Sequence, residues 1–355
     1  MSGMLELVTV FAARKDGFPV CRIPSLLAAA DGTLLAFCEG RQDGGDHASN
    51  RIVLKRSHDG GRTWEPARVI AAAGADSLND PSAALDRRTG RLVLHYARFA
   101  AGFHTDRAVP GYDHPRASAN YVIVSDDAGA SWSAPSEVTR QVKRPTVRCT
   151  VVTCGIGIQL RRGPHAGRLV HAAYQFGGRH EHEAYAVFSD DGGTTWRMGA
   201  VAAGTDWAAE PQVVELADGR VMMNVRTRTG CRKVAFSADG GSTFTDLADD
   251  PALIEPGCQA SIFRAGDPLD GQPSLLLFSN PASRTERVSG TVRLSLDEGA
   301  TWPLARPLYR GGFAYSCLGM LPDGTLLCLF EADEYQRIVL ARFAPAWLQA
   351  GQTRS

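Results

Sequence analysis

The chain has 355 residues, and its 38 Lys and Arg side chains balance 38 Asp and Glu side chains. Because it has neither a basic field nor an aromatic-basic stripe, the sequence excludes nucleic acid as a partner. No apolar run reaches the length of a membrane span, and Met1–Glu6 lacks a signal-peptide pattern, so we expect a soluble protein without a membrane partner, in a compartment that stays open.

Predicted strands follow one another along the chain, separated by turns, and no long amphipathic helix competes with them. Examples are Thr33–Phe37, Arg91–Tyr96 and Thr325–Phe330. Asp-Gly pairs, which favour tight β turns, precede several of these strands. Two stretches predict irregular loops, and long loops on a rigid scaffold often shape a site. They are Phe99–Ser118 and Val142–Gly155. The sequence therefore predicts an all-β fold.

The eight cysteines form neither a C-x-x-C pair nor a regular framework. This usage favours small buried thiols in strands over a zinc site. We therefore expect no zinc site. We also expect no cofactor.

One eight-residue pattern, Ser-x-Asp-x-Gly-x-Thr/Ser-Trp/Phe, occurs five times. The copies are Ser57–Trp64, Ser125–Trp132, Ser189–Trp196, Ser237–Phe244 and Ser295–Trp302. Their starts lie 68, 64, 48 and 58 residues apart, a self-similarity that marks a stack of equivalent units. Division of the chain by six gives about 59 residues per unit, close to four short strands with their loops. We predict a six-bladed β-propeller that forms a single domain over residues 1–355, with one blade lacking the pattern.

Each copy is interpreted as the turn of a hairpin. The carboxylate of Asp59 can accept hydrogen bonds from the backbone of its own turn, and Gly61 can take a positive φ. The ring of Trp64 would then fold back against the sheet.

Charged residues at strand ends are the candidates for chemistry. The first is Arg22, held in extended backbone ahead of Pro24. A Gly-rich loop then carries charged side chains over Glu39–His47. Later, Glu210 and Arg226 are expected to lie near one another across a hairpin. The last candidates are Arg287, Tyr315 and Glu331, each beside a predicted strand.

These motifs, in this order from Arg22 to about Phe343, resemble the sialidase (neuraminidase) family, whose eight-residue repeat is the Asp box or BNR repeat, and in particular the bacterial-type enzymes of glycoside hydrolase family 33. The resemblance implies that the Asp boxes lie on the face remote from substrate. It implies an arginine triad of Arg22, Arg226 and Arg287. It implies Asp46 as the acid/base, Glu210 and Tyr315 as the nucleophile pair, Glu331 as the partner of Arg22, and Arg41 and Asp80 along the sugar's hydroxyl side.

The chemistry explains these residue types. A sialic acid carries a carboxylate on its anomeric carbon, which three guanidinium groups bind through charge-assisted hydrogen bonds. The same carboxylate would repel a carboxylate nucleophile, and sialidases with a Tyr nucleophile are a known exception to the two-carboxylate scheme. A Tyr needs a base, which Glu210 supplies. Asp46 would protonate the leaving oxygen and then deprotonate water.

The resemblance thus implies a retaining exo-α-sialidase that acts on glycans ending in sialic acid and that requires no metal. Two alternatives stay open, a trans-sialidase and a non-catalytic propeller that binds sialoglycans. Linkage preference, sialic acid type and oligomeric state are not predicted.

Several positions have neighbours that compete for the same role. Arg284 competes with Arg287, Asp43 with Asp46, and Arg228 and Arg232 flank Arg226. The sequence departs from the family at Cys21, where an aromatic residue is more usual, and at Phe244, which replaces a Trp. Contacts to the N-acetyl or glycerol arm are unassigned, with two candidates, Trp207 and Phe103.

Overall fold

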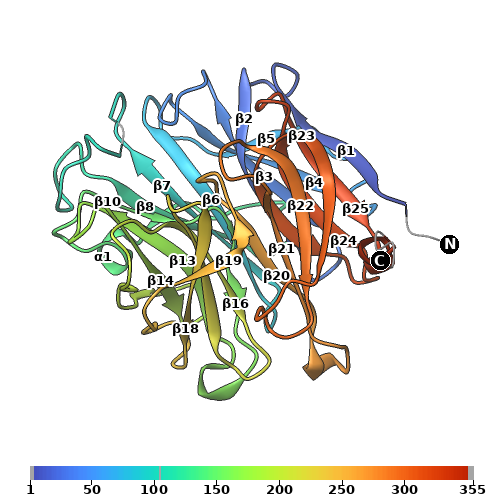
Figure 1. Cartoon of the computed structure of the whole chain (residues 1–355). Coiled ribbons are helices and arrows are strands. Elements are labelled where there is room, and N and C mark those ends of the chain that lie inside the picture. Colours follow the sequence, from blue (N-terminus) through green and yellow to red (C-terminus); the bar gives the residue numbers. More distant parts are fainter. Residues whose placement is uncertain (1–3, 104, 351–355) are drawn as a thin grey trace.

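A computed structural model describes residues 4–103 and 105–350 of the chain. In this part of the chain the fold is all-β, as predicted, with strands gathered into five hydrogen-bonded sheets (Figure 1). Two short α-helices, α1 (Thr139–Val142) and α2 (Pro345–Gln349), accompany them, with 3-10 turns at Gly163–His165 and Pro268–Asp270. No helix in the described ranges is both long and apolar enough to cross a membrane.

Each sheet is built mainly from antiparallel neighbours in chain order. The first contains β2 (Val20–Ala28), β3 (Leu34–Arg41), β4 (Arg51–Ser57) and β5 (Arg68–Ala71). The second contains β6 (Ser77–Asp86), β7 (Arg91–Phe99), β8 (Ala119–Ser125), β9 (Ser136–Glu137) and the parallel β11 (Gly155–Ile156). The third contains β10 (Cys149–Val152), β12 (Ile158–Gln159), β13 (Leu169–Phe176), β14 (His182–Ser189) and β15 (Arg197–Met198).

The last two sheets complete the set. The fourth contains β16 (Ala209–Glu215), β17 (Val221–Arg226), β18 (Cys231–Ser237) and β19 (Ala248–Ile254). The seven-stranded fifth sheet contains β20 (Ser261–Gly266), β21 (Leu275–Pro281), β22 (Val288–Ser295), β23 (Leu304–Met320), β24 (Leu326–Ala332), β25 (Arg337–Phe343) and β1 (Glu6–Ala12).

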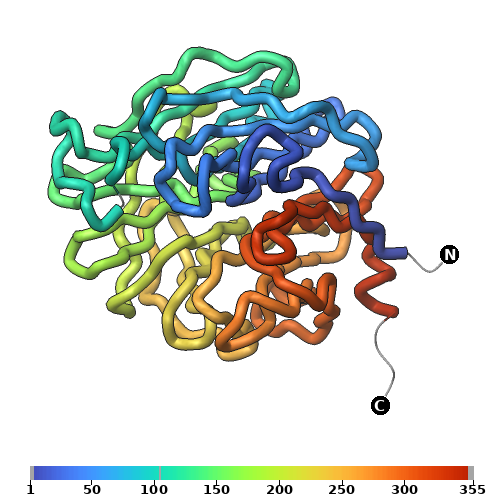
Figure 2. The backbone as a smooth tube through the Cα atoms, turned by 90° about the horizontal axis from the view of Figure 1, so that it is seen from above, coloured from blue at the N-terminus to red at the C-terminus, as the bar shows by residue number. Residues whose placement is uncertain are grey.

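The sheets follow one another around the molecule in a β-propeller-like arrangement. Strand β2 contacts β6 on one side and β23 on the other, while β16 contacts β13 and β20. The N-terminal β1 pairs antiparallel with β25, so the two ends of the chain meet in one sheet, where blue lies beside red (Figures 1 and 2). The sequence analysis did not predict β1, and it wrongly placed β10 and the start of β11 in an irregular passage.

The predicted turn chemistry of the Asp box is confirmed. Asp59 accepts hydrogen bonds from the backbone nitrogen of Thr63 at 2.9 Å and from its hydroxyl at 2.6 Å, while Ser57 accepts one from the Gly61 nitrogen at 2.8 Å. The Trp64 indole folds back to donate to the Gly61 carbonyl at 3.1 Å. These bonds fix the turn locally, without help from any ligand.

The box glycines also join neighbouring sheets. Gly129, with a φ of 77°, lies so close to Leu35 of the preceding sheet that a Cβ would stand 2.3 Å from a leucine methyl carbon. The glycine of the third box, Gly193, packs in the same way against Val93, again one sheet back. The pattern therefore holds the sheets together as scaffold.

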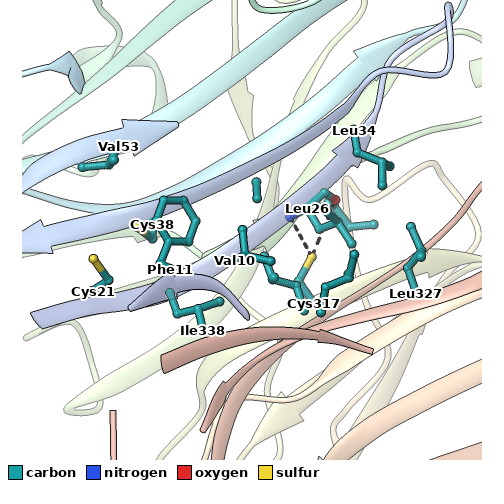
Figure 3. Close-up of a cluster of buried hydrophobic side chains, with 14 of the residues drawn as sticks. Val10, Phe11, Cys21, Leu26, Leu34, Cys38, Val53, Cys317, Leu327 and Ile338 are labelled. Carbon is teal, nitrogen blue, oxygen red and sulfur yellow. Dashed lines mark hydrogen bonds between the residues drawn. The ribbon is translucent and has the colours of Figure 1, made fainter. Parts of the chain in front are cut away.

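A hydrophobic core fills the space between the first and last sheets (Figure 3). Val10 and Phe11 of β1 pack there with Leu26 of β2 and Ile338 of β25. Cys317 lies among them, and its sulfur accepts a hydrogen bond from the Leu26 nitrogen at 3.2 Å. All eight cysteines are buried and unpaired, as the sequence analysis expected, but Cys154 and Cys258 lie outside the strands.

Candidate active site

Three strands share a backbone irregularity that places side chains of the candidate site. Ile23, Asp80 and Glu210 have φ angles of 62°, 56° and 39°, and each stands directly before a proline. In β2, β6 and β16 the strand register shifts at this position. An extra residue of this kind bends a strand and re-aims a side chain. Left-handed backbone is costly for residues with side chains and is concentrated at functional sites.

Tyr315 of β23 and Glu210 of β16 form the centre of the cluster. The Tyr315 hydroxyl donates a short hydrogen bond to one Glu210 carboxylate oxygen. Arg226 of β17 donates to the other oxygen at 2.6 Å and to the Tyr315 hydroxyl at 3.2 Å. The predicted proximity of Glu210 and Arg226 across the hairpin is confirmed. A phenol, a carboxylate and a guanidinium thus form one closed hydrogen-bonded set.

The surroundings shift the pKa values of Tyr315 and Glu210 in opposite directions. Burial, and next the Glu210 carboxylate, raise the pKa of Tyr315 well above its usual range, against the opposing charges of Arg226 and Arg287. Burial would also raise the pKa of Glu210, but the Arg226 charge and the hydrogen bonds from Tyr315 and Arg226 lower it overall. The pair therefore consists of a neutral phenol beside an ionised carboxylate, with the proton acceptor already in contact.

Arg22 is fixed by Glu331 of β24. Its Nε and Nη2 atoms each donate to a Glu331 oxygen at 3.0 Å, in a bidentate pair buried from solvent. The same carboxylate accepts hydrogen bonds from the backbone nitrogens of Ile23 at 2.8 Å and Tyr315 at 3.2 Å. Glu331 therefore links β2, which carries Arg22, to β23, which carries Tyr315. Nη1 of Arg22 takes no part in the hydrogen bonds to Glu331.

Asp46 occupies the loop between β3 and β4, close to two arginines. Its carboxylate accepts a hydrogen bond from Arg41 Nη1 at 2.7 Å and lies 3.7 Å from Arg22 Nη1. Burial opposes ionisation of Asp46, but the Arg41 and Arg22 charges prevail, and its pKa is lowered. The competing Asp43, which is exposed like Asp46, accepts a hydrogen bond from the Gly45 nitrogen of its own turn. Of the two aspartates, Asp46 is the one that contacts the cluster.

The two competing arginines near β22 lie in different surroundings. Arg287 stands 5.5 Å from the ring centre of Tyr315 and donates to the Gly257 carbonyl at 3.3 Å. Arg284 instead donates to the Gly230 carbonyl at 3.0 Å. The structure brings Arg287, not Arg284, to the tyrosine.

Asp80 and Arg41 meet through Glu39, whose role the sequence analysis missed, because it assigned Glu39 to a Gly-rich loop, whereas the residue lies within β3. Glu39 of β3 is buried, pairs with Arg41 at 2.7 Å and accepts a hydrogen bond from the Asp80 nitrogen at 2.8 Å. Burial, followed by the Glu39 and Glu210 charges, raises the pKa of Asp80 well above its usual range. The raised pKa favours the protonated form of the Asp80 carboxyl, which can donate a hydrogen bond.

Of the remaining candidate residues, some lie beside the cluster and others lie away from it. Trp207 lies 5.5 Å from the Arg226 guanidinium, and Arg228 stacks on the same ring at 4.6 Å. Arg232 is fully buried and pairs with Glu255 inside the fourth sheet, so it is a structural residue. Phe103 contacts Arg116 within its own long loop.

Tyr335 is a second residue that the sequence analysis missed. Its ring centre lies 4.1 Å from the Arg22 guanidinium, and its hydroxyl accepts a hydrogen bond from Arg287 Nη1 at 3.1 Å. Its backbone is left-handed, with a φ of 69°. Among the described residues, no group of three His, Cys, Asp or Glu side chains is arranged to hold a metal ion.

Together, the Asp-box fold and this cluster of arginines, carboxylates and a tyrosine define a β-propeller-like protein with a strongly charged candidate site. Comparison with known proteins gives the family. Residues 24–328 match the BNR repeat-like domain. A sialidase of Micromonospora viridifaciens is 41% identical over 348 residues, which cover 94% of this chain and 53% of the relative. Sialidase-2 of Rattus norvegicus is 30% identical, with 91% of each chain covered.

A solved structure agrees with these sequence relatives. The Hadza microbial sialidase Hz136 superposes with a TM-score of 0.86 at 31% identity, covering 95% of this chain and 68% of the other. The chain therefore belongs to the sialidase family with BNR repeats. It spans about half the length of the Micromonospora relative and 62% of a Bacteroides fragilis sialidase that is 33% identical to it.

Proposed function

We propose that this protein is an exo-α-sialidase that releases terminal α-linked sialic acids from glycoconjugates with retention of anomeric configuration. The observation that carries the proposal is the Tyr315–Glu210 hydrogen bond, set among Arg22, Arg226 and Arg287. A nucleophile and its base in contact, beside cations that suit a carboxylate, match what this substrate requires.

In the first step, the three arginines hold the sugar carboxylate and place the anomeric carbon at the Tyr315 hydroxyl. The phenol oxygen forms a bond to that carbon as its proton passes to Glu210. The bond to the departing glycosidic oxygen breaks, and Asp46 gives that oxygen a proton. The result is an aryl glycoside, in which the anomeric carbon of the sugar is bonded to the Tyr315 oxygen, with Glu210 protonated and Asp46 ionised.

In the second step, Asp46 removes a proton from water, whose oxygen attacks the anomeric carbon from the opposite face. The bond to Tyr315 breaks, and Glu210 returns the proton to the phenolate. Two displacements retain the configuration, and the scheme needs no metal and no cofactor. Glu331 holds Arg22, while Arg41 and Asp80 face the sugar hydroxyls.

Asp46 must gain a proton before it can act as the acid, although the two arginines lower its pKa. Binding of the substrate carboxylate neutralises part of the charge on Arg22. The pKa of Asp46 then rises in the complex, which brings its acid form closer to working pH. Substrate binding and protonation of the acid are therefore coupled.

We also propose that the strands form six blades. Within the seven-stranded sheet, the 17-residue β23 pairs with β22 through its first half and with β24 through its second half. The partner changes between Gly312, which pairs with β22, and Phe313, which pairs with β24, and a register shift between Phe313 and Ser316 follows directly. Counting this sheet as two blades supports a six-bladed propeller formed by residues 1–355 as a single domain.

The test is hydrolysis of a fluorogenic α-sialoside, measured across a broad pH range. We expect activity in the wild type, a loss of at least about 10³-fold in kcat for Tyr315→Phe, and little change for Tyr121→Phe, a tyrosine on β8 remote from the cluster. An inactive wild type would refute the enzyme proposal. Full activity in Tyr315→Phe would refute the mechanism. Release of sialic acid to a sugar acceptor in preference to water would identify a trans-sialidase instead.

A further inference from the structure

The turn between β24 and β25 has an unusual backbone. Asp333, Glu334 and Tyr335 follow one another with φ angles of 54°, 52° and 69°, and none of them is glycine. These φ angles lie in the left-handed region of backbone conformation, which is costly for residues with side chains. Single left-handed residues are therefore the rule, and three in succession are exceptional. Such strain persists only where the surrounding structure over-determines it.

The contacts that hold this turn are specific. The Asp333 carboxylate accepts hydrogen bonds from the Tyr309 hydroxyl and from Arg337, whose Nε lies at 2.8 Å. The Asp333 nitrogen donates to the Gly312 carbonyl at 3.1 Å. A Cβ on Gly312 would stand 3.2 Å from the Glu334 nitrogen, so a glycine at this point admits the turn. Two neighbouring strands, β23 and β25, thus enforce the strained conformation.

The result of the strain is the placement of Tyr335. Its ring covers the face of the Arg22 guanidinium at 4.1 Å, while its hydroxyl receives the hydrogen bond from Arg287. Glu331, four residues earlier on the same hairpin, binds the edge of Arg22. One hairpin therefore fixes both the edge and the face of Arg22, and it reaches Arg287 as well.

Arg287 differs from the other two arginines in its partners. Arg22 and Arg226 form ion pairs with Glu331 and Glu210, but no carboxylate within the described ranges pairs with Arg287. Its guanidinium donates to two neutral oxygen atoms, those of Gly257 and Tyr335. A neutral hydroxyl can orient a guanidinium without cancelling the charge that an anionic ligand requires.

We propose that Tyr335 is a positioning residue, which sets the orientation of Arg22 and Arg287 relative to each other for a ligand carboxylate. The inference rests on the proposed function in that the ligand carries such a carboxylate. Tyr335 lies between the two cations, so its ring also separates their like charges, and its cation–π contact favours the charged state of Arg22. The strained turn is the structural means of this placement.

The test compares Tyr335→Phe, which keeps the ring, with Tyr335→Leu, which removes it. The probe is 2-deoxy-2,3-didehydro-N-acetylneuraminic acid, a sialic acid analogue with an intact carboxylate, titrated by calorimetry. We expect binding about tenfold weaker for Tyr335→Phe, the loss of one hydrogen bond to a charged group, and a further loss for Tyr335→Leu.

The matched control is Phe236→Leu. Phe236 also covers an arginine, Arg220 at 4.9 Å, but outside the cluster. This variant should bind the analogue as the wild type does. Kinetics supply a readout that a merely structural role would not move. For Tyr335→Phe we expect KM to rise about tenfold with kcat within about twofold, because binding of ground state and transition state weakens alike.

Wild-type hydrolysis with unchanged analogue binding in Tyr335→Phe would overturn this inference and leave the proposed function intact. A wild type that fails to hydrolyse sialosides would instead overturn the proposed function, while calorimetry would still test Tyr335. If Tyr335→Leu does not fold, Tyr335→Phe decides alone. A fall in kcat at unchanged KM would also contradict the positioning role.

Discussion

Glu331 offers the sharpest test of how the site is held together. The Glu331→Gln variant keeps the size and shape of the side chain but removes its charge. The carboxylate accepts four hydrogen bonds, two from Arg22 and one each from the nitrogens of Ile23 and Tyr315. An amide offers one oxygen, and its NH₂ group must face donors. Within the part of the chain that the structure describes, the only carboxylate left beside Arg22 would then be Asp46, at 3.7 Å, whose side chain is 65% exposed.

The magnitude follows from burial. Removal of one partner from a buried ion pair costs about 3–5 kcal/mol, and we take about 3 kcal/mol because the amide preserves part of the hydrogen bonding. Unfolding entropy of roughly 2.1 cal/mol/K per residue gives about 0.75 kcal/mol/K for a chain of this length, so Tm should fall by about 4 °C. Binding of the sialic acid analogue should weaken in the same variant, because Arg22 loses its orientation.

The control is Glu65→Gln. Glu65 also binds an arginine through both oxygens, with Arg56 Nε and Nη2 at 3.0 Å each, but its side chain is 40% exposed. A surface pair of this kind contributes about 0–1 kcal/mol, so Tm should move by about 1 °C or less. Thermal unfolding by calorimetry measures both. Equal shifts in the two variants, or a wild-type Tm in Glu331→Gln, would refute the reasoning.

Three further predictions concern single groups. Asp46→Asn should lose about 10²–10⁴-fold in kcat on a sialyllactose, and much less on an aryl sialoside, whose leaving group needs no proton. The control Asp43→Asn should be near wild type on both substrates. Equal losses of Asp46→Asn on the two substrates would contradict an acid role. Arg287→Ala should weaken analogue binding far more than Arg284→Ala, and the reverse ranking would show that the wrong arginine was chosen. Burial lowers the pKa of His171 to about 3, against about 6.5 in the unfolded chain. The unfolded state therefore takes up the proton first, so stability is full above pH 6.5 and should fall by up to about 1.4 kcal/mol per pH unit below it. Thermal unfolding of His171→Gln should show a shallower pH dependence than the wild type, and an identical dependence would contradict this.

The sequence predicted the fold class because the Asp boxes repeat a local hydrogen-bonded turn. Their spacing revealed the succession of units before any long-range contact was known. It could not reveal β1, whose partner β25 lies at the other end of the chain, so the closure of the last sheet depends on a contact with no local signal. Strand β10 was missed because it is short and buried along its length, so its residues do not alternate.

The sequence predicted those site residues that belong to recognisable motifs. It did not predict residues whose role depends on the neighbours that they contact. The convergence of Arg22, Glu210, Arg226 and Tyr315 was expected from order along the chain. Glu39 and Tyr335 carry no motif, because their importance comes from what they contact. The left-handed positions before Pro24, Pro81 and Pro211 were visible in the sequence only as X-Pro pairs, and proline within a strand usually marks an edge or a bulge.

The central claim is that Tyr315, with Glu210 as its base, is the nucleophile. The most direct measurement uses a sialosyl fluoride with a second fluorine at C3, which slows release of the sugar from the enzyme, followed by proteolysis and mass spectrometry. We expect a single sialyl adduct on the peptide that contains Tyr315, and none in Tyr315→Phe. An adduct on Glu210 or any other carboxylate, or turnover of the wild type with no adduct at all, would contradict the mechanism.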